Sequence, residues 1–290
     1  MKRKLTTVLL TLVLMAGLAV MLYPSASDYY NSFHQSRAIA HYAEEIANID
    51  TETYERLWRE ATEYNRELAG RSNQFILSEA EREEYNRILN YSGNGVMGYI
   101  NIPKITCELP IYHTTEESVL QIAIGHIEGS SLPVGGESTH CVLSGHRALP
   151  SAKLFSNLDL LEPGDTFVLR VLDETLTYEV DQIRTVLPNE LQDLYIEEGR
   201  DYCTLVTCTP YGINTHRLLV RGHRVANAEE ALVIRVTADA LRVDSVFVAS
   251  TAALPILLII MLWVFTGDSP STGKAKKSSK KPDTERRDSK

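Results

Sequence analysis

The stretch from Thr204 to Leu218 places the strongest constraint on what this chain can fold into. It reads TLVTCTPYGINTHRL, so an apolar, β-prone run ends at Cys208 and a second apolar run begins after Arg217. The loop between them contains proline, glycine and asparagine. Two short apolar runs around such a loop are typical of antiparallel strands. The pattern therefore predicts a thiol at the end of one strand and a guanidinium at the start of the next.

A third chemical group lies at another predicted strand end. His146 follows the apolar run Cys141–Leu143, in the segment SGHR. A free cysteine is only a few per cent thiolate at pH 7, so it needs a base or a cation nearby to act as a nucleophile. An arginine fork can hold a thiolate, a substrate carbonyl or an oxyanion. Cys208, His146 and Arg217 are therefore a candidate set for nucleophilic catalysis.

Charge is distributed unevenly along the chain, whose net charge is -9. Basic residues open the chain and enrich its tail, whereas between its two apolar segments 18 basic residues face 34 acidic ones. Nucleic-acid binding depends on basic groups at phosphates, so this acidic middle argues against a nucleic-acid partner.

The cysteines and the remaining histidines show no metal-ligand spacing. Because no Cys-x-x-Cys occurs among the four cysteines, zinc ribbons and thioredoxin-like sites are disfavoured. We expect Cys107, Cys141 and Cys203 to be small buried hydrophobes, unpaired with Cys208. His126 and His140 are expected to be structural. We predict no catalytic metal and no cofactor.

Two apolar segments predict membrane spans. Residues 5–23 are just long enough to cross a bilayer, and residues 246–265 are free of charge. A cleavable signal peptide is the alternative for the first segment, although its apolar run is longer than is usual for one. Basic residues flank both segments, in residues 1–4 and 266–290, which predicts that both termini are cytoplasmic and that the acidic middle is extracellular.

Between these spans, composition changes from helical to β-prone. Residues 24–92 are expected to be mainly helical, with Ser78 and Glu81 forming a capping box that opens a helix at Glu79–Leu89. This region is either a spacer packed on the following domain or a regulatory flap. Residues 93–227 carry short β-prone runs with Gly/Pro punctuation, typical of a barrel or sandwich. Residues 228–245 are a linker.

The expected elements of the β-prone region can be given by residue. Strands are expected at Met97–Ile102, Glu108–Ile111, His140–Ser144, Thr166–Leu172, Thr175–Val186, Tyr202–Cys208 and Arg217–Val225, with short helices at Glu116–Ile124 and Ala152–Leu160.

Four motifs in this region resemble the sortase family. The most specific is Thr-Leu-x-Thr-Cys with an arginine nine residues after the cysteine; the others are Ser144–Arg147, Gly98–Ile105 and Gly125–Gly136. The resemblance covers roughly residues 95–225. It implies a mainly β, sortase-type closed barrel with short helices, here preceded by a helical region and flanked by two transmembrane helices. It also implies the membrane of a Gram-positive bacterium.

The resemblance assigns roles to the three candidate residues. Cys208 would attack the Thr–Gly bond of a sorting signal such as Leu-Pro-x-Thr-Gly and form a thioester. His146 would donate and accept protons, and Arg217 would stabilise the oxyanion, before an amine takes the acyl group. Thr207 is a candidate substrate contact. The floor of the barrel and the loop from Pro188 to Gly199 are the candidate groove for the signal.

The flanking regions resemble class C sortases, which polymerise pilins, so the partners would be secreted pilins and the acceptor a pilin lysine. One departure concerns the lid. Many class C members carry an Asp-Pro-aromatic motif before the barrel, and here the matching stretch reads NQFILS. Phe75 is the one aromatic residue in it and the candidate lid residue.

Three alternatives remain at this point. A wall-anchoring sortase would use the same three residues. A papain-like wall hydrolase is disfavoured because here the histidine precedes the cysteine. A membrane-tethered binding module would show no reaction at Cys208.

Overall fold

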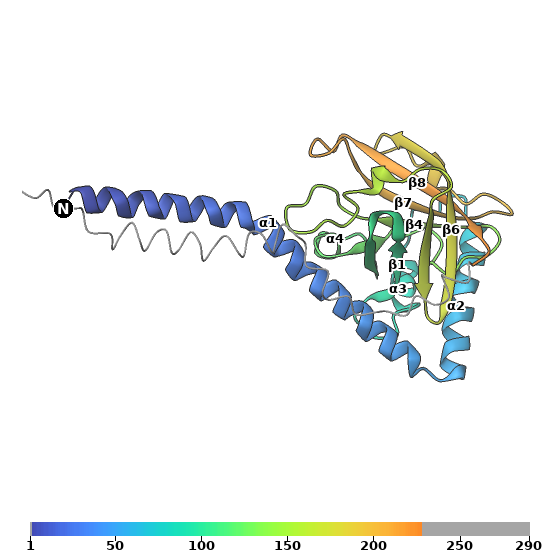
Figure 1. The fold of residues 1–290 in the computed structure, drawn as a ribbon. Helices are drawn as coiled ribbons and strands as arrows, with labels where there is room; N and C mark the ends of the chain where they lie inside the picture. The colour runs from blue at the N-terminus through green and yellow to red at the C-terminus, as the bar shows by residue number, and fades with distance from the viewer. Residues whose placement is uncertain (1, 228–290) are drawn as a thin grey trace, which may run out of the picture. The chain divides into compact units, whose positions relative to one another are not determined.

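A computed structural model describes residues 2–227, in which eight strands close into a barrel in the order β1-β2-β3-β4-β7-β8-β6-β5 (Figure 1). The strands are β1 Val96–Ile102, β2 Cys107–His113, β3 Ile124–His126, β4 Thr139–Ser144, β5 Thr166–Val171, β6 Glu174–Val186, β7 Asp201–Thr209 and β8 His216–Val225. The helices are α1 Lys2–Ala47, α2 Thr51–Ala69, α3 Glu79–Arg87 and α4 Glu117–Leu120, with 3₁₀ turns η1 Pro103–Ile105, η2 Leu158–Leu160 and η3 Gln192–Leu194.

The seven predicted strands are all present, and the closed barrel is confirmed. An eighth strand, β3, was missed because it is only three residues long, and it begins at Ile124, the last residue of the segment predicted as the helix Glu116–Ile124. Only Glu117–Leu120 of that segment is helical. The predicted helix Ala152–Leu160 was also wrong, because turns occupy most of it and only the η2 turn at Leu158–Leu160 remains.

The region before the barrel is helical, as predicted, but it divides differently. One helix, α1, continues through Pro24 to Ala47. Asp50 caps the next helix by accepting from the backbone N–H of Thr53, which explains the break between α1 and α2. The capping box of Ser78 and Glu81 at the start of α3 is confirmed. Figure 1 shows α2 turning back along the barrel from the end of α1.

The second half of α1 is part of the core. Ile39, Tyr42 and Ile46 are buried in the same cluster as the barrel interior. The Tyr42 hydroxyl donates to the carbonyl of Met97 on β1 at 3.1 Å and accepts from the backbone N–H of Leu172 at 2.7 Å. Burial of a tyrosine whose hydroxyl is paired on both sides fixes the helix against the barrel.

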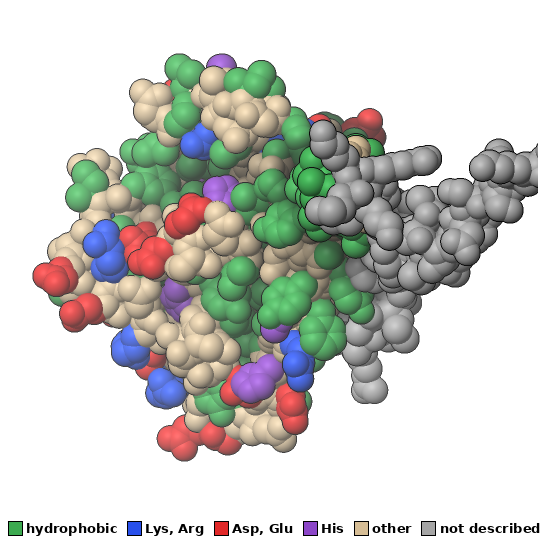
Figure 2. Space-filling model, turned by 90° about the vertical axis from the view of Figure 1, so that its left-hand side faces the viewer, with side chains coloured by type: hydrophobic (Ala, Val, Ile, Leu, Met, Phe, Trp, Pro, Cys, Tyr) green, Lys and Arg blue, Asp and Glu red, His purple; other side chains and the backbone are tan. Residues whose placement is uncertain are grey.

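Among the described residues, one helix is long and apolar enough to cross a membrane, and it is α1. Its apolar part, which contains the predicted span 5–23, is exposed on the protein. The predicted linker 228–245, second span 246–265 and basic tail 266–290 lie outside the described residues. On the face drawn in Figure 2, acidic and basic side chains are interspersed around an apolar middle, so that face has no broad basic surface for nucleic acid.

Candidate active site

Cys208 and Arg217 are direct partners across the antiparallel pair β7 and β8. Residues that pair directly across two strands have their side chains on the same face, within reach of each other. Both side chains are partly exposed. Arg217 Nη1 donates to the carbonyls of His216 and Asn214 at 3.1 and 3.4 Å, so the loop between the strands orients the guanidinium. The hairpin predicted from the sequence is therefore confirmed.

The neighbouring strand places His146 level with Cys208. β4 pairs with β7 in parallel, with Ser144 opposite Val206, and the backbone N–H of Gly145 continues the ladder to the Val206 carbonyl at 3.0 Å. Continuing that register by two residues brings His146 opposite Cys208. The three predicted residues thus lie at one end of the barrel, where β7 ends and β8 begins and where His146 follows β4 by two residues.

The backbone around His146 is held from several sides. A Cβ atom on Gly145 would lie 2.8 Å from the ring of Phe155 and 2.9 Å from the side chain of Ile124, so only glycine fits at this strand end. The Thr207 hydroxyl donates to the Gly145 carbonyl at 2.8 Å. The His146 carbonyl accepts from the backbone N–H of Phe155 at 3.2 Å. These contacts fix the backbone position from which the His146 side chain projects.

The imidazole of His146 has a carboxylate beside it. Its Nε2 lies 3.6 Å from Glu117 Oε2, beyond hydrogen-bond distance, and within the described part of the chain this buried nitrogen has no hydrogen-bond partner. A hydrogen bond from Gln121 and the positive charge of protonated His146 hold the pKa of Glu117 below its usual value. Glu117 was not predicted, because it lies inside the segment expected to be a short helix and belongs to no catalytic motif.

A small apolar cluster lies beside Cys208, on the same face of the sheet. Val206, two residues before Cys208, packs with Val142, Val186, Leu194 and Leu219 in a small cluster separate from the barrel interior. Leu194 comes from the loop Pro188–Gly199, which the sequence singled out as a wall of the groove. We call these five residues the groove cluster.

Phe75 covers the groove cluster, with Ile127 beside it. The ring of Phe75 also meets that of Tyr195 edge-on, at 5.4 Å between centroids. Its neighbour Gln74 is only 3% exposed and bridges both walls of the groove. Gln74 Nε2 donates to the Gly129 carbonyl at 3.1 Å, and its Oε1 accepts from the backbone N–H of Ile196 at 3.2 Å. Sequence patterns did not indicate Gln74.

Comparison with known proteins now places this geometry in a family. Residues 100–225 match the model of the sortase domain. The chain is 54% identical to the crystal structure of sortase C1 from Streptococcus agalactiae, covering 66% of this chain and 100% of that one, with a TM-score of 0.64. It is 46% identical to sortase C of Streptococcus pneumoniae, covering 66% and 97%, with a TM-score of 0.60.

The chain belongs to the sortase family. Its structural neighbours include class C sortases. Among curated proteins it is 31% identical to sortase D of Bacillus subtilis over 44% of this chain and 63% of that protein, and 28% identical to sortase A of Bacillus anthracis over 45% and 60%. The matched segment thus spans less than two thirds of these two relatives.

In this sortase Thr207 faces the barrel interior. Thr207 is 1% exposed, and its hydroxyl donates a hydrogen bond to the Gly145 carbonyl. A direct substrate contact, which the sequence suggested, stays a prediction. The hydrogen bond to Gly145 gives Thr207 a role in holding the strand end that precedes His146.

Two other histidines of the sortase domain are buried in hydrogen-bond networks. His140 Nδ1 donates to the Tyr195 carbonyl at 2.9 Å, which leaves Nε2 to accept from the Thr204 hydroxyl at 2.7 Å. Burial lowers the pKa of His140 from 6.5 to about 4. His126 Nδ1 lies 3.0 Å from the Tyr85 hydroxyl, and its Nε2 lies 2.8 Å from the Ser131 carbonyl. Both residues serve the structure, as expected.

The four cysteines are free. Cys141 and Cys203 are buried, as expected, and are direct partners between β4 and β7. Cys107 is only partly buried, because it lies on the rim of a cavity, where its sulfur is 3.9 Å from the Leu154 carbonyl. Within residues 2–227, no group of three or more metal-binding side chains is placed to share an ion.

Proposed function

We propose that this protein is a membrane-anchored cysteine transpeptidase that cleaves a sorting signal of the Leu-Pro-x-Thr-Gly type between Thr and Gly and transfers the acyl group to an amine. The observation that carries this proposal is the end of the barrel where β7 ends, β8 begins and His146 follows β4. There Cys208 pairs directly with Arg217, and the register brings His146 level with Cys208.

Acylation follows from these three groups. The Cys208 sulfur attacks the carbonyl carbon of the signal's threonine, and the electron pair of the carbonyl moves to oxygen. Arg217 stabilises that oxyanion with its fixed fork of N–H donors. Protonated His146 donates its proton to the departing glycine nitrogen as the C–N bond breaks. A thioester on Cys208 and a free amine leaving group result.

Transfer reverses the roles. The acceptor amine attacks the thioester carbonyl, and neutral His146 takes the proton that the amine loses. Collapse of the second tetrahedral intermediate forms the new amide and releases the Cys208 sulfur. Glu117 Oε2 lies 3.6 Å from His146 Nε2, so a carboxylate stands beside the imidazole that exchanges these protons.

The likeness to class C enzymes supports a pilin as substrate and a pilin lysine as acceptor. The solved sortase C of Streptococcus pneumoniae is described in terms of pilin substrate specificity. The helical region before the barrel is also consistent with this class. A wall-anchoring sortase remains the alternative within the family, since the same three residues would serve it.

The groove cluster fits the Leu and Pro of the signal, because it is apolar and its member Val206 lies two residues before Cys208 on β7. In the structure Phe75 occupies it, so we propose that the segment around Phe75 is a lid that must move before the signal binds. One structural neighbour, sortase A from Corynebacterium diphtheriae, was solved as a lid mutant and is 38% identical, covering 62% of this chain and 98% of that one, with a TM-score of 0.57.

The apolar start of α1 supports membrane anchoring. We propose that it crosses the membrane with residues 1–4 in the cytoplasm and that the barrel lies outside a Gram-positive cell. The second span, at residues 246–265, belongs to the same proposal. Both termini would then be protected from protease added outside protoplasts.

The experiment is a transfer assay on the purified protein. A Leu-Pro-x-Thr-Gly peptide is incubated with and without a lysine-containing acceptor peptide, and products are identified by mass. Joined peptide supports the proposal. Cleavage without any joined product indicates a hydrolase, and an intact peptide indicates a binding module.

A further inference from the structure

One face of α1 changes from polar to apolar side chains as the helix reaches the barrel. Asp28, Asn31 and Gln35 are spaced three and four residues apart, so they lie on one side of the helix. The same side continues with the buried residues Ile39 and Tyr42. The apolar part anchors the helix in the core, and the polar part, which we call the polar stripe, lies closer to the proposed membrane span.

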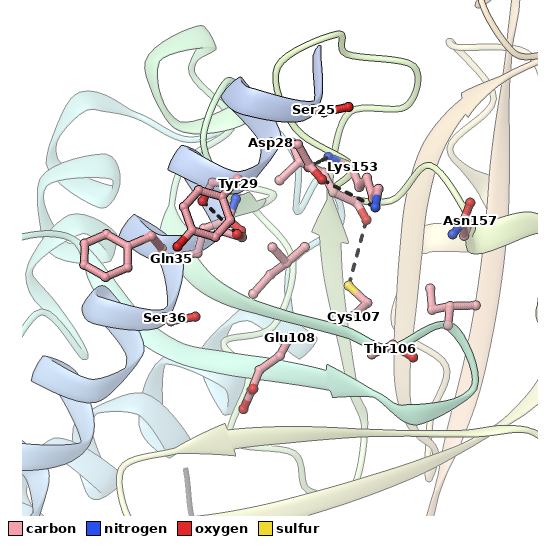
Figure 3. A pocket seen from close by; sticks show the side chains of 15 residues that line it. Ser25, Asp28, Tyr29, Gln35, Ser36, Thr106, Cys107, Glu108, Lys153 and Asn157 are labelled. Atoms are coloured by element: carbon pink, nitrogen blue, oxygen red, sulfur yellow. Dashed lines mark hydrogen bonds and ion pairs between the residues drawn. The ribbon is translucent and has the colours of Figure 1, made fainter. Parts of the chain in front are cut away.

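The polar stripe contacts the loop that follows His146. Asp28 Oδ1 accepts from the backbone N–H of Lys153 at 2.8 Å, and its Oδ2 lies 3.5 Å from the ammonium of the same lysine. Asn31 Nδ2 donates to the Ser151 carbonyl at 2.8 Å. Figure 3 shows Asp28 and Lys153 pointing toward one another from the helix and the loop.

That loop in turn determines where His146 lies. The backbone N–H of Phe155, two residues after Lys153, donates to the His146 carbonyl, and the ring of Phe155 packs against Gly145. On the other side of His146, Gln35 Nε2 donates to the carbonyl of Ile122 at 2.6 Å, just after the short helix that carries Glu117. The polar stripe therefore holds both segments that flank the imidazole.

The contact depends on hydrogen bonds more than on close packing. A cavity of about 270 Å³ lies between α1, η1, β2 and the loop, lined by both polar and apolar side chains, with Cys107 at its edge (Figure 3). With so much open space, few apolar contacts replace a lost hydrogen bond here. Above the cavity, Ile39, Tyr42 and Ile46 remain buried, so the helix stays docked when the polar contacts are removed.

We propose that Asp28 and Asn31 are positioning residues for His146, which act through the backbone of Ser151–Phe155. The helix that leaves the membrane would then be part of the catalytic arrangement as well as a tether. This inference rests on the proposed function, because it assumes that His146 transfers protons in the reaction.

The test uses the full-length chain in detergent micelles and the double variant Asp28→Ala/Asn31→Ala. Ser32→Ala is the matched control, because Ser32 lies on the same turn of α1 and, within residues 2–227, its hydroxyl donates to its own helix at the Tyr29 carbonyl. Asp28→Asn is the conservative variant, because its amide oxygen can still accept from the Lys153 N–H. Two kinds of measurement are made: hydrogen exchange of the peptide 147–157, and steady-state kinetics (kcat and KM) with a sorting peptide.

In the double variant the backbone amide of Lys153 should exchange its hydrogen at least tenfold faster than in the wild type. Its kcat should be at least fivefold lower, with KM within twofold of the wild type. Ser32→Ala and Asp28→Asn should stay within twofold of the wild type in both kinds of measurement. Wild-type exchange in the double variant, or faster exchange with an unchanged kcat, overturns the positioning role. The two failures are distinguishable. If the wild type does not convert the peptide, the proposed function fails; if the double variant exchanges at the wild-type rate, the positioning role fails whether or not the enzyme is active.

Discussion

The hydroxyl of Thr207 donates to the carbonyl of Gly145, with 2.8 Å between the two oxygens. These residues immediately precede Cys208 on β7 and His146 at the end of β4. The bond therefore links the backbone positions from which the nucleophile and its proton-transfer partner project. It is buried, since Thr207 is 1% exposed, so water does not compete for either oxygen.

Thr207→Val should weaken catalysis while keeping the side-chain shape. Valine leaves the buried Gly145 carbonyl without its partner, which costs about 1–3 kcal/mol of the free energy of unfolding. We expect kcat to fall by about tenfold, because the backbone that carries His146 is held less firmly and its imidazole is oriented less precisely. Urea unfolding and single-turnover kinetics measure the two effects. Thr207→Ser, which keeps the hydroxyl, should retain most of the activity, and a fully active valine variant would refute the role.

Arg217→Lys should lower kcat/KM strongly. Lysine keeps the charge but loses the planar fork, so it is not an equivalent donor to an oxyanion. The expected loss of transition-state stabilisation is about 2–4 kcal/mol, the range for one lost oxyanion donor. The matched control is Arg221→Lys on the same strand, whose partner is Asp181, and it should change little. An unchanged rate in Arg217→Lys would mean that Arg217 has no part in the chemistry.

The lid should be held by Gln74 as well as by Phe75. Burying Phe75 contributes about 1.5–3 kcal/mol at most and the two hydrogen bonds of Gln74 about 1 kcal/mol each, and the conformational entropy lost on ordering the loop offsets part of both. We expect Cys208 to react with a small thiol reagent without prior activation. Phe75→Ala should speed labelling severalfold, and Gln74→Ala about tenfold.

Peptide mapping resolves the labelling of Cys208 from that of the other cysteines. Ile76→Ala is the control, because Ile76 is 74% exposed beside the same residues. A wild-type Cys208 that stays unlabelled for hours, then reacts over a hundredfold faster in Phe75→Ala, would indicate a tight lid and would falsify this prediction.

Stability should depend on pH through His140. Burial lowers its pKa from 6.5 to about 4, so between these values the unfolded chain binds a proton that the folded protein does not. The free energy of unfolding should therefore fall as pH falls from 6.5 to 4, by about 3 kcal/mol from this group. Urea unfolding of the ectodomain across this range measures the slope.

His140→Gln should flatten that slope, whereas His34→Gln, at an exposed position on α1, should leave it unchanged. Protonation adds a hydrogen to His140 Nε2, so the bond that is lost is the one accepted from the Thr204 hydroxyl, whereas Nδ1 still donates to the Tyr195 carbonyl. A slope that survives His140→Gln would assign the pH dependence to another group.

Local patterns in the sequence predicted the parts of the site that depend on neighbours along the chain. The loop after Cys208 predicted a hairpin, and the hairpin register is what makes Cys208 and Arg217 partners. The capping box at Ser78 was correct for the same reason, since its bonds span three residues.

The residues that were missed act over long separations, where no local pattern exists. Gln74 bonds Gly129 and Ile196, 55 and 122 residues away, and Asp28 bonds Lys153 over 125 residues. Glu117 reaches His146 only because β3, a strand too short to predict, brings their segments together. Tertiary contacts of polar side chains leave no periodic signal in the sequence.

The most direct test of the central claim is intact-mass analysis of the ectodomain after incubation with a Leu-Pro-x-Thr-Gly peptide, followed by mapping of the modified residue. The account predicts an adduct of the mass of the Leu-Pro-x-Thr acyl group on Cys208, labile to hydroxylamine as a thioester is, and absent in a folded Cys208→Ala variant. An adduct that persists in Cys208→Ala, or one that maps to another cysteine, would contradict it.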